Sequence, residues 1–84
     1  MDVFVTFPAT LDVSADVIED TLDDAIGERG EVAGGGVGPA GMTLELDVED
    51  DVAPREIVDL ILGALKGLGL TPEKIVVNGV TFGR

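Results

Sequence analysis

The chain has 84 residues, of which 17 are Asp or Glu and only 5 are Lys or Arg, so its formal net charge is −12. It contains no His, Cys, Trp or Tyr, which removes the commonest general base, thiol chemistry, disulfides and the soft metal ligands. Because the phosphates of DNA and RNA repel a strongly acidic protein, binding to nucleic acid is not expected.

The first predicted element is a strand over residues 2–7, where β-branched and aromatic residues alternate with others. Its apolar face would carry Val3, Val5 and Phe7, and its other face Asp2, Phe4 and Thr6. Ser14 is a suitable N-cap for a following helix, because apolar residues recur at helical spacing from Ala15 onward. Gly30, directly after Arg29, predicts the end of that helix.

The glycine-rich segment 31–37 predicts a frayed and bulged edge strand that runs into a turn over residues 38–41. Glycine-rich loops can wrap phosphate, but such loops precede a helix and supply a Lys, and neither follows here. We therefore predict a flexible loop, either a mobile hairpin or one that lets the backbone of a partner approach closely. Its residues would be Gly34, Gly35, Gly36, Gly38 and Gly41.

The clearest predicted strand is Met42 to Val48, because apolar and polar residues alternate strictly along it. Met42, Leu44, Leu46 and Val48 would be buried, and Thr43, Glu45 and Asp47 exposed. Such a strand belongs to a sheet that is covered on one side only.

Pro54 suits the first position of a second helix, and Gly67 and Gly69 predict its end. Its apolar stripe would comprise Ile57, Val58, Ile61, Leu62, Leu65 and Leu68. Residues 74–82 predict the last strand. Asn78-Gly79 would form a bulge or a bend within it, because too few residues follow to build a full partner strand.

This order of elements predicts a single α+β domain over residues 1–84 with a ferredoxin-like βαββαβ arrangement. Four antiparallel strands would form the sheet, and both helices would cover one face. No apolar segment reaches the length of a membrane span, and the first residues lack the basic charge of a signal peptide. We therefore expect a cytoplasmic protein with no membrane contact.

The uncovered face of this sheet is the predicted binding surface for a partner. Its residues would be Phe4, Thr6, Thr43, Glu45, Asp47 and Glu49. Phe4 would serve as an apolar anchor, and the carboxylates would pair with Lys or Arg of a basic protein. Two alternatives stay open: Phe82 covers Phe4, or the acidity serves only solubility.

Catalysis and metal binding are not expected, and neither is a cofactor. Carboxylates spaced along one strand spread out in a row instead of converging on one ion. Asp23 and Asp24, the adjacent acids that could act as acid and base, point to different sides of an exposed helix. The predicted function is therefore a non-enzymatic acidic interaction module that binds a basic protein or self-associates. The alternative is a small-ligand-binding or regulatory domain that dimerises through its sheet.

Residues 28–78 resemble small uncharacterised bacterial proteins with a ferredoxin-like layout. The shared features are a "GEVxGGG" turn at residues 30–36, the alternating strand 42–48, and a helix end at Leu68-Gly69-Leu70. Some small acidic proteins of this kind are immunity proteins or inhibitors, so the resemblance implies a role in neutralising a basic toxin. It implies no site residues.

Overall fold

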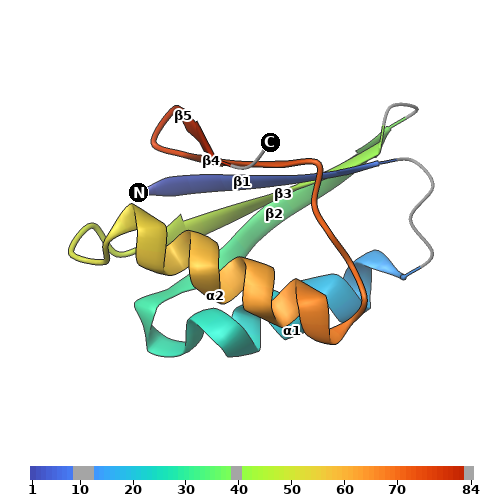
Figure 1. Cartoon of the computed structure of the whole chain (residues 1–84), viewed down its shortest axis with the longest axis horizontal. Helices are drawn as coiled ribbons and strands as arrows, with labels where there is room; N and C mark the ends of the chain where they lie inside the picture. Colours follow the sequence, from blue (N-terminus) through green and yellow to red (C-terminus); the bar gives the residue numbers. More distant parts are fainter. Residues whose placement is uncertain (9–12, 39–40, 83–84) are drawn as a thin grey trace.

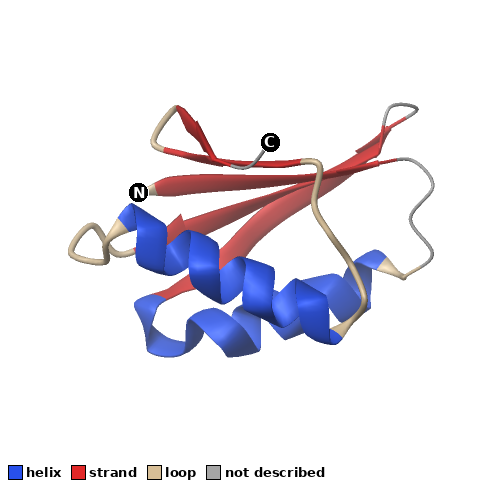
Figure 2. Ribbon diagram, viewed as in Figure 1, coloured by secondary structure: helices blue, strands red, loops and turns tan. Residues whose placement is uncertain are grey.

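The computed structural model describes residues 1–8, 13–38 and 41–82. Two α-helices, α1 (Ala15–Ile26) and α2 (Pro54–Gly67), and the 3-10 turn η1 (Gly27–Arg29) accompany one antiparallel sheet. Its strands are β1 (Asp2–Pro8), β2 (Gly30–Gly38), β3 (Gly41–Val48), β4 (Lys74–Val77) and β5 (Val80–Phe82), in the order β2-β3-β1-β4-β5. Both helices lie on the same side of this sheet (Figures 1 and 2). The protein therefore has an α+β fold.

The sheet has five strands instead of the predicted four, because the chain turns back at Asn78-Gly79. Both turn residues have positive φ, 49° for Asn78 and 81° for Gly79, as a tight two-residue hairpin requires. The prediction of a bulge or bend was wrong. Three residues are enough for the added strand, because Phe82 pairs with Ile75 and packs against the hydrophobic core.

The ends of the helices follow local sequence signals. The Ser14 hydroxyl accepts a hydrogen bond from the Val17 backbone N–H at 3.4 Å, which confirms the predicted N-cap of α1. The α-helix stops at Ile26, three residues before the predicted end, because Gly27 adopts a φ of +62°. Pro54 opens α2 as predicted, but Leu62 is 40% exposed and does not belong to its buried stripe.

The core lies between the helices and the inner face of the sheet. Its sheet residues are Val3, Val5, Phe7, Met42, Leu44, Leu46, Val48, Ile75 and Val77, all buried. The alternation predicted for β1 and β3 is thereby confirmed. Within the described residues, neither helix is both long and apolar enough to cross a lipid bilayer.

The glycine-rich segment forms the predicted edge strand, which is longer than predicted and includes the glycines that were assigned to a flexible loop. β2 pairs with β3 from Gly30 to Gly38, with one irregularity between Val32 and Gly34 that matches the predicted bulge. Gly34, Gly35, Gly36 and Gly38 lie in β2 and Gly41 opens β3, so the predicted flexible loop is replaced by paired strands. Pro39 and Ala40 of the predicted turn lie outside the described residues.

Candidate functional site

The side of the sheet away from the helices, which we call the open face, carries three rows of residues across neighbouring strands. Each row consists of residues that are paired directly across the strands. The acidic row contains Glu31, Asp47 and Asp2. The middle row contains Gly34, Glu45, Phe4, Val76 and Thr81, and the third row contains Gly36, Thr43, Thr6 and Lys74. Five of the six residues predicted for the binding surface, all except Glu49, therefore share one face. In the third row, the hydroxyls of Thr6 and Thr43 lie 3.5 Å apart.

Phe4 is the large apolar residue at the centre of the open face, and it is 37% exposed. Its cross-strand neighbours are Glu45 on β3 and Val76 on β4. Phe82 pairs with the buried Ile75 and so faces the helices, which rules out the alternative that Phe82 covers Phe4. A partly exposed phenyl ring thus lies between a carboxylate and an aliphatic side chain.

The acidic row places like charges side by side. Asp47 is directly opposite Asp2 on one side and directly opposite Glu31 on the other, and all three residues are exposed. Carboxylates in directly opposed positions of a sheet destabilise the pairing of the strands. The fold therefore keeps a locally unfavourable arrangement at one end of the open face, a pattern that is more typical of binding sites than of purely structural surfaces.

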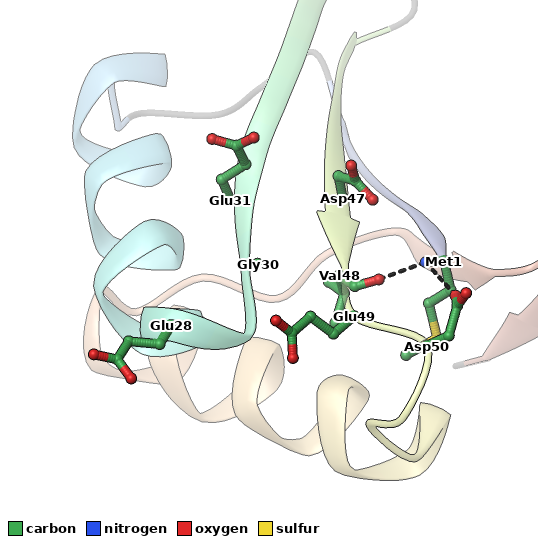
Figure 3. A pocket seen from close by; sticks show the side chains of 8 residues that line it. All are labelled: Met1, Glu28, Gly30, Glu31, Asp47, Val48, Glu49 and Asp50. Carbon is green, nitrogen blue, oxygen red and sulfur yellow. Dashed lines mark hydrogen bonds and ion pairs between the residues drawn. The ribbon is translucent and has the colours of Figure 1, made fainter.

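Two residues of the acidic row, Glu31 and Asp47, line a hollow of about 400 Å³ at this end of the sheet (Figure 3). The hollow is lined by Met1, Glu28, Gly30, Glu31, Asp47, Val48, Glu49 and Asp50. Glu49 lies beyond the end of β3, where its backbone N–H donates to the Arg29 carbonyl at 2.8 Å. It therefore belongs to this hollow and not to the strand row in which it was predicted.

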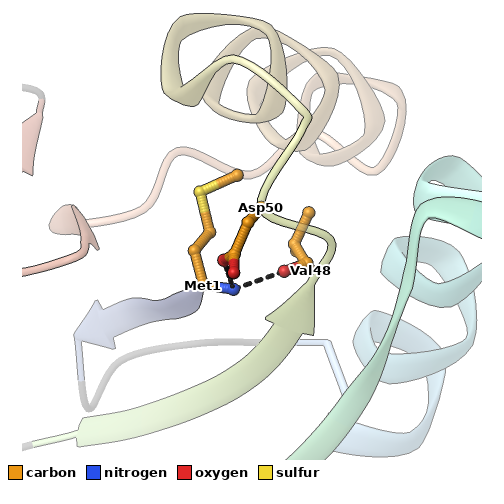
Figure 4. Close-up of polar contacts among 3 residues, drawn as sticks. All are labelled: Met1, Val48 and Asp50. Atoms are coloured by element: carbon orange, nitrogen blue, oxygen red, sulfur yellow. Dashed lines mark hydrogen bonds and ion pairs between the residues drawn. The ribbon is translucent and has the colours of Figure 1, made fainter.

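Met1 lines this hollow, and Figure 4 shows the contacts that its positively charged α-ammonium group makes with Val48 and Asp50. It donates to the Val48 carbonyl and, at 2.8 Å, to the Asp50 carboxylate. The hydrogen bond to Asp50 raises the pKa of the Met1 amine, and the nearby charges of Asp47 and Asp2 act in the same direction. The same ammonium group lowers the pKa of Asp50.

Replacing Asp50 by asparagine is expected to bring the pKa of the Met1 amine down toward its ordinary value, because the main cause of the rise is removed. In the wild type, the raised amine pKa stabilises the fold below about pH 8, and the lowered carboxyl pKa stabilises it above about pH 4. This contribution is lost as the pH rises through the folded amine pKa or falls through the folded pKa of Asp50. An NMR titration of the Met1 amine in the wild type and in Asp50→Asn measures the difference in its pKa.

Asp51→Asn is the matched control for this titration, because Asp51 is exposed and makes no ion pair in the described part of the chain. It should lower the amine pKa much less than Asp50→Asn does. Equal values in the two variants would contradict the assigned partner of the ammonium group.

Sequence reasoning missed Glu28, Glu31 and Asp50 as neighbours, because they come from η1, β2 and the segment after β3 and meet only in the fold. It also missed Val76 beside Phe4. The signal was weak there, because Ile75, Val76 and Val77 form an unbroken apolar run that hides which residue faces outward.

The acidic residues of the described segments do not form a group of three or more that is arranged to hold a metal ion. Asp23 and Asp24 are both exposed on α1. The open face thus combines the negative charge of the acidic row with the partly exposed apolar side chains of Phe4 and Val76.

Comparison with protein-family models, with curated protein sequences and with solved structures gave no match to this chain.

Proposed function

We propose that the protein is a non-enzymatic interaction module that binds a basic protein through its open face, in the manner of an immunity or inhibitor protein. The observation that carries the proposal is the exposed ring of Phe4 one row away from the opposed carboxylates of Asp2, Asp47 and Glu31. We also propose that β1–β4 form a ferredoxin-like arrangement to which β5 is added at one edge. The proposed location of the protein is the cytoplasm.

The open face offers both kinds of contact that a protein interface needs. Aromatic residues near the centre of an interface often contribute most of the binding energy, and Phe4 has that position with Val76 beside it. Lys or Arg side chains of a partner would neutralise the acidic row and so relieve the repulsion around Asp47. The net charge of −12 would also speed the encounter with a basic protein at low salt.

The distribution of charge on the open face fixes an orientation for the partner. The acidic row lies at one end, and Lys74 lies in the third row, beyond Phe4. A partner whose basic residues meet the acidic row would place a polar or acidic residue near Lys74.

The experiment is affinity capture from the native host with three baits: wild type, Phe4→Ala and Asp47→Asn. We expect the wild type to retain a basic protein. Each substitution should weaken binding by roughly tenfold or more, as loss of a central aromatic or of a paired charge does. Raising the salt to about 0.5 M should weaken the wild-type complex further.

Val17→Ala and Asp20→Asn are the matched controls, because both residues are exposed on α1, away from the open face. Both controls should retain the captured protein. Capture of an acidic protein, or binding that Phe4→Ala and Asp47→Asn leave unchanged, would overturn the proposal.

A further inference from the structure

The two edges of the sheet differ in how well they are protected against pairing with another chain. β5, at one edge, has three residues, whereas β2, at the other, has nine and pairs only with β3 in the described part of the chain. Natural proteins shield exposed edges by keeping them short or by placing charged residues and bulges on them. The irregularity lies between Val32 and Gly34, so residues 34–38 pair regularly with β3 and carry neither a bulge nor a charge, and no other described strand pairs with them.

The outer segment of β2 is also nearly free of charge on a very acidic molecule. The strand carries one charged residue, Glu31, at its beginning, and residues 34–38 carry none. Val37 is 79% exposed, the largest exposed fraction among the large apolar side chains of the described residues. It borders a hollow of about 230 Å³ whose lining includes Val13 and Ala15, beside the start of α1.

We propose that β2 pairs in antiparallel fashion with β2 of a second copy of the chain, which joins two sheets into one and covers Val37. A second copy fits this edge better than a basic partner does, because the edge offers a basic protein almost no charge to bind. Two molecules of charge −12 repel each other, and at this uncharged segment their backbones can approach without bringing carboxylates of the two strands together.

When two copies pair through β2 around a two-fold axis, the β2 edge of each copy is occupied, so pairing through β2 stops at two chains. The expected mass in solution is therefore twice the 8.7 kDa of one chain. Salt should favour this dimer by screening the repulsion between the two chains. That dependence is opposite to the one expected for binding of a basic partner at the open face, so the two proposals can fail independently.

The test measures the mass by light scattering or sedimentation up to roughly 1 mM protein, at low and high salt. Val37→Lys places a charge on the edge and should weaken the dimer by roughly tenfold or more, without lowering the melting temperature of the dilute protein. Val80→Lys is the matched control, because Val80 is a 58% exposed valine on the opposite edge. Hydrogen exchange of the 34–38 amides should slow as the protein concentration rises.

A dimer that Val37→Lys dissociates and Val80→Lys leaves intact supports the proposal. It is overturned if the wild type stays monomeric at the highest concentration and salt. It is also overturned if the assembly grows beyond two chains, if the two lysine variants behave alike, or if Phe4→Ala is what dissociates the dimer.

Discussion

Replacing Phe7 by alanine is expected to lower the free energy of unfolding by about 3–5 kcal/mol, the usual cost of removing a phenyl ring from a core. Phe7 is fully buried on β1, on the face that the helices cover. A loss of that size would remove a large part of the stability of a domain this small, whose total is on the order of 5–10 kcal/mol. Urea unfolding followed by far-UV circular dichroism measures the difference.

Phe4→Ala is the matched control, because the same substitution is made in the same strand on the opposite face. Phe4 is 37% exposed, so its loss should cost no more than about 1 kcal/mol. The ratio of the two losses reports which side of β1 faces the core. Similar losses in the two variants would show that the open face is covered and would remove the proposed binding surface.

The faces of β1 and β3 could be predicted from the sequence because their environment is simple. One side of each strand is buried and the other exposed, so apolar and polar residues alternate with the period of a strand. The alternation also restricts the register of β3 against β1, because a shift of β3 by one residue would turn Leu44 and Leu46 to the exposed face. The positions of Phe4, Glu45 and Asp47 on one face were predictable for this reason.

Other elements could not be predicted because tertiary contacts outweigh their local sequence preferences. An edge strand was predicted for residues 31–37, but its glycines also suggested a flexible loop, whereas pairing with β3 continues as far as Gly38. Val80–Phe82 looked too short to form a strand, but pairing with β4 and contact of Phe82 with the core stabilise it. The sequence does not show these contacts.

The hollow beside the acidic row could not be predicted from the sequence either, because its residues meet only in the fold. Glu28, Glu31 and Asp50 are separated along the chain, and nothing in their spacing indicates that they line one hollow with the Met1 ammonium group. Only the overall excess of Asp and Glu was visible. The excess indicated a basic partner, and the fold adds the end of the sheet where that charge is concentrated.

Replacing Gly41 by alanine is expected to lower the free energy of unfolding by roughly 3 kcal/mol, as a strained backbone combined with a steric conflict does. Gly41 has a φ of +138°, which L-residues rarely adopt. An added Cβ would lie 2.0 Å from the backbone carbonyl oxygen of Phe7. Because backbone cannot move away as a flexible side chain can, β1 and β3 would have to separate where Pro8 pairs with Gly41.

Gly36→Ala is the control, since it is another glycine of the same hairpin but has no atom within 4 Å of an added Cβ. Its φ lies outside the positive range. Alanine there should leave stability unchanged or raise it by up to about 1 kcal/mol, because it reduces the freedom of the unfolded chain. Urea unfolding at low protein concentration measures the change in the free energy of unfolding for each of the two variants. If Gly41→Ala were as stable as Gly36→Ala, the close approach of Gly41 to Phe7 would be wrong, and with it the pairing of β1 and β3 at that end of the sheet.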